Sequence, residues 1–399
     1  MQLFNTQSGS IERVTARDGK LGLYVCGVTP YDTTHAGHAF TYLTFDVLIR
    51  FLRFSGIDVT YVQNVTDIDD DILRKAKELG TTWDELGRSE TEKFRTDVRD
   101  LNMLDPTHYV RATDHIAEIV SIAQQLVDSG HAYESNGNVY YSVDSDPDFG
   151  TLSHLTRPEM LPVANERGNN PNDPNKRDPL DFVLWQAAQP GEPTWESPWG
   201  PGRPGWHIEC SAMATRYLGP TVDIHGGGSD LIFPHHECEI AQTEPITGQK
   251  PYVRYWMHTA MVEYQGEKMS KSLGNLVKVR DVLQTYNPDA FRLYLLAHHY
   301  RTPWEYQDDE LDEYARLADD IREAVNFPAY GIEQIVDVVP YREQFFNAIE
   351  DDFNVPGAIA AVSEIVSAIL EAPDDDDVRD AQEILQTLSD ILGLALMEQ

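Results

Sequence analysis

Apolar positions near the start of the chain follow a strand, helix, strand order. Residues 21–27 form a short apolar run that ends in glycine, which predicts a buried strand. Residues 39–55 are apolar on most faces and are followed by Gly56, which predicts a helix packed on a sheet. Residues 58–64 predict a second strand. Because a crossover helix joins two parallel strands, this order predicts a doubly wound α/β domain.

The pattern changes over the middle of the chain. Residues 66–130 look mainly helical, and residues 137–143 are expected to form a strand. Residues 145–205 are rich in Pro, Gly, Asn and Asp, which is typical of loops and turns. This stretch therefore predicts an insertion into the first domain.

Two later apolar stretches, residues 221–225 and 253–262, are strand candidates that can rejoin the first sheet. We therefore expect a split Rossmann-like nucleotide-binding domain over residues 1–305. Its insertion is expected at about residues 100–205.

After Tyr306 the apolar spacing becomes helical. The first helical stripe consists of Leu311, Tyr314, Ala315, Ala318, Ile321, Ala324 and Val325. Residues 341–370 and 379–396 repeat the spacing, and four aspartates at 374–377 separate them as an acidic linker. Residues 306–399 are therefore expected to form a small α-helical bundle.

Composition and charge narrow the class of protein. The chain has 399 residues, of which 41% are hydrophobic, so it can build a large core and is neither a disordered tail nor a small disulfide scaffold. Its formal net charge is −35, and residues 306–399 alone hold 24 acidic and four basic side chains. Nucleic-acid partners normally need a basic footprint. Composition alone therefore favours a solvated, repulsive surface over a nucleic-acid interface.

The chain contains no apolar run long enough for a membrane span, and its start lacks the pattern of a signal peptide. We therefore expect a cytoplasmic protein without a membrane partner. A disulfide framework is not expected in such a protein. Each of Cys26, Cys210 and Cys238 is then either a small core residue or a reactive or metal-binding thiol.

Two histidines follow the first predicted strand and open the first long helix, in the order His35-Ala-Gly37-His38. Free N–H groups at a helix N-terminus favour an anion, which both histidines can also hydrogen-bond. Gly37 lets a nucleotide lie close to the backbone. The alternative is a turn with two ordinary capping histidines.

A basic segment, Lys268-Met-Ser-Lys-Ser272, follows the last predicted strand. Two lysines and two hydroxyls within five residues suit a triphosphate, because flexible ammonium groups can follow charge as it develops on the departing pyrophosphate. The alternative is an exposed basic loop.

Four residues form a candidate metal site. Cys26 lies at the end of the first strand, Cys210 follows a glycine-rich turn, and His235 and Glu239 have the i, i+4 spacing of one helix face. Two thiolates, an imidazole and a carboxylate match the ligand preferences of zinc. A solvated surface pair at 235 and 239 is the alternative. Cys238 does not fit this geometry.

The histidine and lysine motifs together resemble the two signatures of class I aminoacyl-tRNA synthetases. Other segments resemble cysteinyl-tRNA synthetase in particular: Tyr24-Val-Cys-Gly27, residues 61–70, 202–213 and 223–237, and more weakly residues 351–356. The resemblance covers about residues 20–305. It implies one zinc ion per chain on Cys26, Cys210, His235 and Glu239.

The resemblance also implies which residues bind ATP, which bind L-cysteine and which act in catalysis. Catalytic roles on the phosphates fall on His35, His38, Lys268 and Lys271, with Mg²⁺ bound to ATP. ATP-binding roles fall on Thr29, Gly37, His38, Gly226, Gly227, Gly228, Met269, Ser270, Lys271 and Ser272. Cysteine-binding roles fall on Cys26, Gly27, Thr66, Trp206 and Asp230. Since zinc distinguishes a thiolate from a hydroxyl, no editing domain is expected.

The acceptor of the activated cysteine has two candidates. One is the 3′ end of tRNA-Cys; the other is glucosaminyl-inositol, the acceptor of the related ligase of mycothiol synthesis. Two features favour the sugar ligase. The segment Glu166-Arg-Gly-Asn-Asn-Pro171 resembles one of its motifs, and the shortened bundle leaves no room for an anticodon-binding domain. The residue types at Glu239 and His225 resemble those of the tRNA ligase. We therefore favour tRNA as the acceptor, and we expect the protein to act as a monomer. A zinc-stabilised binding protein fails to explain two intact ATP motifs, and a simple nucleotidyltransferase fails to explain the zinc set.

Overall fold

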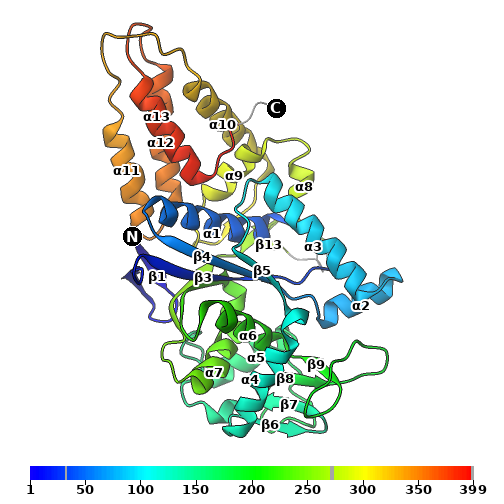
Figure 1. Cartoon of the computed structure of the whole chain (residues 1–399). Helices are drawn as coiled ribbons and strands as arrows, with labels where there is room; N and C mark the ends of the chain where they lie inside the picture. Colours follow the sequence, from blue (N-terminus) through cyan, green and yellow to red (C-terminus); the bar gives the residue numbers. More distant parts are fainter. Residues whose placement is uncertain (32–33, 270–273, 397–399) are drawn as a thin grey trace.

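The centre of the computed structural model, which describes residues 1–31, 34–269 and 274–396, is a five-stranded parallel sheet in the order β11-β10-β3-β4-β5 (Figure 1). Its strands are β3 (Lys20–Val28), β4 (Asp58–Val65), β5 (His108–Arg111), β10 (Val222–Gly228) and β11 (Val253–Thr259). The four predicted core strands are confirmed, although the last is shorter than expected. Because strand order reverses between β3 and β10, the sheet has the switch point of a doubly wound fold.

Strand β5 is a correction, because we expected residues 66–130 to be mainly helical. Helices α2 (Asp70–Leu79), α3 (Trp83–Asp100) and α4 (Ile116–Asp128) fulfil that expectation, but His108–Arg111 pairs with β4. A long-range contact holds this edge strand, since Arg111 Nε donates to Asp67 Oδ2 at 2.8 Å. Four residues are too few for a recognisable period in the sequence.

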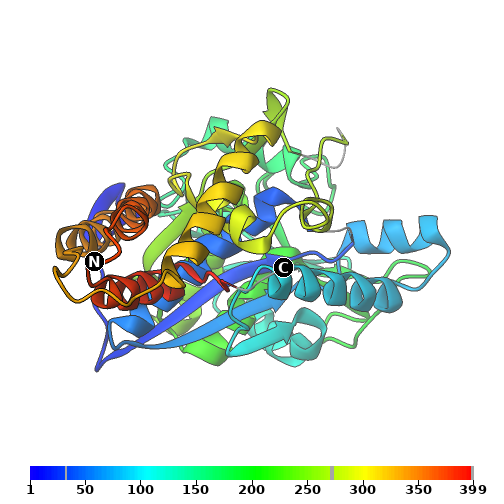
Figure 2. The same cartoon turned by 90° about the horizontal axis from the view of Figure 1, so that it is seen from above.

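Helices cover both faces of the sheet. Helix α1 (Ala36–Phe54) lies on the side of the bundle and α6 (Trp206–Leu218) on the side of the insertion (Figure 1). The predicted helix at 39–55 is thus confirmed. It begins earlier because His35 caps its N-terminus. Seen from above, α11–α13 gather at one end of the sheet, while α2 and α3 extend to the other side (Figure 2).

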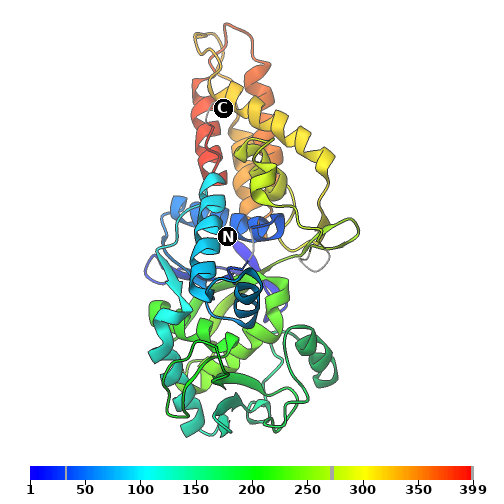
Figure 3. The same cartoon turned by 90° about the vertical axis from the view of Figure 1, so that its right-hand side faces the viewer.

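A second sheet lies beyond α6, on the side away from the bundle (Figure 3). It is antiparallel and consists of β6 (Ala132–Ser135), β7 (Asn138–Tyr141), β8 (Phe182–Ala187) and β9 (Gly202–Pro204). Helices α4, α5 (Arg157–Glu166) and α7 (Glu237–Thr247) pack around it. The strand predicted at 137–143 is confirmed as β7. Strands β8 and β9 lie within residues 145–205, whose composition indicated loops, and β6 lies between the predicted helical stretch and the predicted strand.

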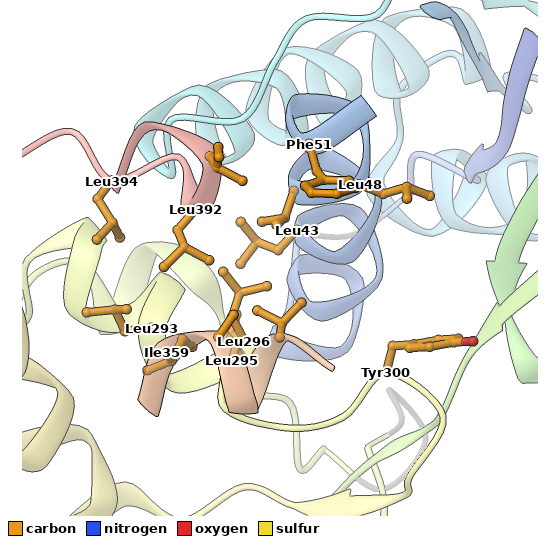
Figure 4. Close-up of a cluster of buried hydrophobic side chains, with 14 of the residues drawn as sticks. Leu43, Leu48, Phe51, Leu293, Leu295, Leu296, Tyr300, Ile359, Leu392 and Leu394 are labelled. Carbon is orange, nitrogen blue, oxygen red and sulfur yellow. The ribbon is translucent and has the colours of Figure 1, made fainter. Parts of the chain in front are cut away.

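The end of the chain is helical, as predicted. Its helices are α10 (Leu311–Val325), α11 (Val339–Glu350), α12 (Val355–Leu370) and α13 (Arg379–Leu392). The stretch expected as one helix at 341–370 is two helices, because Asp352 and Phe353 adopt φ of +50° and +53° between them. Leucines from α1, α9 (Pro288–Leu296) and α13 meet Ile359 of α12 in one core (Figure 4).

Short elements complete the fold. They are β1 (Gln2–Asn5), β2 (Ser10–Arg13), β12 (Val262–Tyr264), β13 (Glu267–Lys268), β14 (Trp304–Glu305) and α8 (Val279–Val282). In the part of the chain that the structure describes, no helix is long and apolar enough to cross a membrane. The architecture is a Rossmann-like domain followed by a helical bundle, which confirms the predicted fold class.

Candidate active site

The predicted chemistry gathers at the carboxyl edge of the central sheet. Strands β3, β4, β10 and β11 end at Val28, Val65, Gly228 and Thr259. Parallel strands place the residues that follow them on one edge, so Thr29, Thr66 and Asp230 lie there. The switch point between β3 and β10 opens at this edge, which is where doubly wound sheets bind their ligands.

The two motif histidines stack at the start of α1. Their ring centroids lie 3.8 Å apart with planes at 29°. His35 Nδ1 accepts a hydrogen bond from Gly37 N at 3.2 Å, which makes His35 the cap of the helix. Both rings are only partly buried. The pair therefore stands beside the positive end of a long helix, in a position suited to a phosphate.

Only the flanks of the lysine motif can be placed. Lys271, Ser270 and Ser272 lie outside the described residues, as does the side chain of Lys268, whose backbone ends β13. Met269 is buried, and its N–H donates to Val262 O at 3.3 Å.

After the motif, the chain returns beside the histidines. Ala36 N donates to Val277 O at 2.8 Å, and Val279 N donates to Thr34 O at 3.1 Å. His35 and Lys278 form an isolated antiparallel bridge in the same register. The described flanks thus tie the segment that follows the lysines to the residues that precede α1.

The structure brings the four predicted metal ligands together. One donor atom each from Cys26, Cys210, His235 and Glu239 lies within 4.8 Å of all the others, and all four residues are buried. The two Sγ atoms are 3.8 Å apart, and His235 Nε2 lies 3.4 Å from Glu239 Oε1. The alternative of a solvated surface pair at 235 and 239 is therefore excluded, because both side chains are buried. The donor set and its closeness fit a zinc ion.

The electrostatics of the cluster also fit a cation. Burial raises the pKa of Cys26 well above its usual value, and the neighbouring Cys210 and Glu239 raise it further. Burial likewise lowers the pKa of His235, which keeps the imidazole neutral, as a metal ligand must be. A bound divalent ion would lower the pKa of Cys26 instead, because it stabilises the thiolate.

Two further histidines adjoin the cluster and were not predicted as ligands. His225 Nε2 lies 2.9 Å from Glu239 Oε2, and His236 Nε2 lies 3.2 Å from Cys26 Sγ. With Cys26 and Glu239 they form a second set of four donors within 4.8 Å. The only signal in the sequence was a pair of adjacent histidines and a histidine within an apolar strand.

The predicted cysteine-binding residues surround this cluster. Gly27 N donates to Asn64 Oδ1 at 2.7 Å, and a Cβ at Gly27 would lie 1.6 Å from Asn64 O. Thr66 is buried and accepts from Asn64 Nδ2 at 3.3 Å. Trp206 stacks on His235 with ring centroids 4.3 Å apart. Gly27 thus follows one predicted metal ligand in the chain and Trp206 stacks on another, and the roles of these residues toward cysteine stay predictions.

The glycine triplet at the end of β10 has a packing reason of its own. A Cβ at Gly226 would lie 2.1 Å from Phe45 Cζ, and one at Gly228 would lie 2.6 Å from Asp230 Oδ1. At Gly227 the nearest atom would belong to Leu231, at 2.9 Å. The buried ring of Phe45 thus favours glycine at Gly226, whereas the neighbours of the other two positions are the ends of side chains that can move. Contact of the triplet with adenosine stays a prediction.

Cys238 stands apart from both donor sets. It is buried in the apolar cluster of the insertion with Ile208 and Phe233. Burial raises the pKa of its thiol, which makes it a core residue of low reactivity.

Solved structures that share this fold include aminoacyl-tRNA synthetases. A Mycobacterium tuberculosis methionyl-tRNA synthetase in complex with methionyl-adenylate matches with a TM-score of 0.65 at 14% identity, over 94% of this chain and 89% of the other. The family model described as tRNA synthetases class I (C) catalytic domain matches residues 12–316, and a DALR domain model matches residues 344–397. The chain belongs to the class I (C) tRNA synthetase family.

Curated relatives carry two names. A cysteine--tRNA ligase of Dehalococcoides mccartyi is 43% identical over 100% of this chain and 87% of its own length. A cysteine--tRNA ligase of Hahella chejuensis is 47% identical over 94% of this chain and 81% of its own. The L-cysteine:1D-myo-inositol 2-amino-2-deoxy-alpha-D-glucopyranoside ligase of Catenulispora acidiphila is 46% identical over 94% and 90%. The resemblance stated from the sequence is therefore confirmed at the level of the family.

Proposed function

We propose that this chain activates L-cysteine with ATP, forming cysteinyl-adenylate, and transfers the cysteine to the 3′ end of tRNA-Cys. The observation that carries the proposal is the buried set of two thiols, an imidazole and a carboxylate, placed at the same sheet edge as a histidine pair on a helix N-terminus. Most of the relatives above 40% identity are named cysteine--tRNA ligases.

In the first step, the carboxylate oxygen of cysteine attacks the α-phosphorus of ATP, and the bond to the bridging oxygen breaks to release pyrophosphate. His35 and His38 would donate hydrogen bonds to the α-phosphate, helped by the positive end of α1. Lys268 and Lys271 would follow the charge on the β- and γ-phosphates, with Mg²⁺ bound to ATP. These groups stabilise charge that develops in the transition state.

The amino-acid side of the site selects the substrate. A zinc ion on Cys26, Cys210, His235 and Glu239 would supply a soft Lewis acid for the thiolate of cysteine. Thr66, Trp206 and Asp230 would orient the ammonium and carboxylate groups. Since serine lacks a soft ligand, discrimination would occur on binding, without an editing site.

In the second step, a hydroxyl of the terminal ribose attacks the carbonyl carbon of cysteinyl-adenylate and AMP leaves. Residues 1–305 are proposed as the catalytic domain and residues 306–399 as the helical bundle. The insertion, expected at about 100–205, would begin after β5, because His108–Arg111 pairs with β4 in the central sheet. The bundle is strongly acidic, so we propose that tRNA approaches from the catalytic side, by its acceptor end. The chain is proposed to act as a monomer in the cytoplasm.

Glucosaminyl-inositol is the second candidate acceptor, favoured by the Catenulispora relative. The structure joins the two residues that argue for tRNA, because His225 Nε2 lies 2.9 Å from Glu239 Oε2 in a buried pair. It also places the sugar-ligase-like residues 167–170 and Trp206 on one cavity of about 480 Å³. The His225–Glu239 pair thus favours tRNA and the cavity favours the amino-sugar. We choose tRNA as the acceptor on the basis of the pair.

The deciding experiment offers both acceptors to one preparation of zinc-loaded enzyme. Radiolabelled cysteine and ATP are supplied with a tRNA-Cys transcript, with the amino-sugar, or with both. We expect label in acid-precipitable tRNA that alkali releases as an ester. Label found only in an alkali-stable amide with the amino-sugar would reverse the choice of acceptor. A transcript without its 3′-terminal adenosine is the matched control and should stay unlabelled.

A further inference from the structure

An arginine of the insertion contacts the loop that joins the predicted subsites. Arg167 follows the last residue of α5, and its guanidinium Nη1 donates to the backbone carbonyl oxygens of Asp230 and Phe233. We infer that Arg167 is a positioning residue for the amino-acid substrate. This inference rests on the proposed activation of cysteine. Arg167 acts through the loop and not on the reacting atoms.

The loop has an irregular backbone that needs external restraint. A 3₁₀ turn at Ser229–Leu231 runs into a π-type turn at Ile232–His236, and Phe233 inside it is extended, with φ −135° and ψ 134°. An extended residue interrupts the hydrogen-bond ladder of a helix, so nearby carbonyl groups need other donors. Arg167 supplies one donor group to two such carbonyls.

The same loop connects three predicted subsites. It begins directly after Gly228, carries Asp230 in its first turn and ends at the predicted metal ligand His235. Strand β10 fixes its start, and helix α7 fixes its end. Movement of its middle would therefore shift Asp230 relative to the metal cluster, which would misplace cysteine more than ATP.

A cavity removes packing from one side of this loop. Phe233 and Pro234 line the cavity of about 480 Å³, together with Arg167 and Trp206. Side chains that face a cavity lose van der Waals partners on that side. The hydrogen bonds from Arg167 thus restrain the loop beside the cavity, while the apolar cluster around Phe233 packs it elsewhere.

The other two arginine and lysine side chains of this cavity are engaged elsewhere. Arg203 pairs with Asp70 and Glu192, and Lys176 Nζ donates to Asn169 Oδ1 at 2.5 Å. Among the described residues that line the cavity, Arg167 is therefore the arginine or lysine directed at the loop.

The test compares two substitutions of Arg167. Arg167→Met keeps the aliphatic stem but has no donor, whereas Arg167→Lys keeps a donor. We expect Arg167→Met to raise KM for cysteine by about tenfold or more while KM for ATP stays unchanged, since a charged hydrogen bond to each carbonyl is lost. Arg167→Lys should recover part of the loss. Amide hydrogen exchange over residues 229–236, measured by mass spectrometry, should quicken in Arg167→Met.

Arg157→Met is the matched control. Arg157 begins the same helix, is largely exposed and pairs with Asp144 and Asp178. The Arg157→Met substitution should leave the KM values for cysteine and ATP, and the amide exchange over residues 229–236, unchanged. If Arg167→Met behaves like this control, or raises both KM values together with a lower Tm, the inference is overturned. If the wild-type enzyme shows no cysteine-dependent ATP–pyrophosphate exchange, the proposed function fails instead.

Discussion

The metal cluster depends on side chains that are individually unfavourable in a dry interior. Cys26 Sγ lies 3.8 Å from Cys210 Sγ and 3.8 Å from Glu239 Oε1, all buried. Like charges this close and this poorly solvated cannot all ionise without a cation. We therefore propose that the cluster holds a metal ion through these thiols, which also pack in an apolar cluster with Tyr24 and Val62.

Replacement of Cys26 by serine should remove zinc and cysteine affinity together. A hydroxyl is a harder and weaker ligand than a thiolate, so we expect metal affinity to fall by at least about tenfold. Zinc content by mass spectrometry and cysteine binding by equilibrium dialysis measure the two losses. Cys238→Ala, in the apolar cluster, is the control and should keep both. Full zinc and cysteine binding in Cys26→Ser would remove Cys26 from the site.

Asp69 gives the fold a specific pH dependence. Burial raises the pKa of Asp69 to about 6, although its carboxylate caps α2 by accepting from Asp71 N at 2.7 Å. The folded state binds this proton more tightly than the unfolded chain does. The contribution of protonated Asp69 to the free energy of unfolding is therefore complete below pH 4 and is lost as pH rises through 6. Asp69→Asn keeps the cap but cannot ionise.

We therefore expect the stability difference between Asp69→Asn and wild type to change by about 1–3 kcal/mol between pH 4 and pH 7.5, in favour of the variant at high pH. Urea unfolding at a series of pH values measures it. Parallel curves for the two proteins would show that Asp69 does not titrate in this range.

At the level of elements, the close approach of β3 and β4 sets the distance between the two strand ends beside the predicted cysteine-binding site. Gly27 packs against Asn64 so closely that a methyl group would meet the carbonyl oxygen at 1.6 Å. Gly27→Ala should therefore separate the ends of the two strands, cost about 1–3 kcal/mol or more, and weaken cysteine binding. Thermal unfolding and cysteine titration measure the two effects.

Gly87 in α3 provides the opposite control, because the nearest atom to its Cβ position, apart from those of its own helix, is Asp67 O at 3.9 Å. Gly87→Ala should stabilise the protein by up to about 1 kcal/mol, as expected for a helix interior. A Gly27→Ala protein as stable as Gly87→Ala would contradict the close-packing account.

Long apolar elements were predictable, and short elements held by distant contacts were not. Helix α1 has 19 residues, most of them apolar, and His35 caps its start. Strand β5, by contrast, has four residues and depends on Asp67. The metal cluster itself could not be derived from spacing, since its ligands come from β3, α6, the loop before α7 and α7 itself and leave no local pattern. Family motifs located it.

At the level of the whole molecule, a buried arginine links the bundle to the catalytic domain. Arg292 in α9 donates to Asp46 Oδ2 in α1 at 2.6 Å and to Leu392 O at the end of α13 at 2.7 Å. It also donates to Leu101 O, and it is fully buried. A cation at the C-terminus of α13 also suits the helix dipole. The bundle is thus fixed to the sheet by polar contacts as well as by the leucines of Figure 4.

Arg292→Leu should lower the free energy of unfolding by about 3–5 kcal/mol, because it leaves Asp46 and two carbonyl oxygens with lost partners in a dry interior. Limited proteolysis should then release the bundle helices first. Arg379→Leu, which removes an exposed pair with Asp377, should change neither Tm nor the cleavage pattern. Equal protease resistance in the two variants would show that Arg292 does not hold the bundle in place.

The activation of cysteine is the central claim, and ATP–pyrophosphate exchange tests it most directly. The zinc-loaded protein should incorporate labelled pyrophosphate into ATP when cysteine is present and not when serine replaces it. Removal of the metal by a chelator should abolish exchange, and added zinc should restore it. Absence of cysteine-dependent exchange in zinc-loaded protein, or equal exchange with serine, would contradict the account.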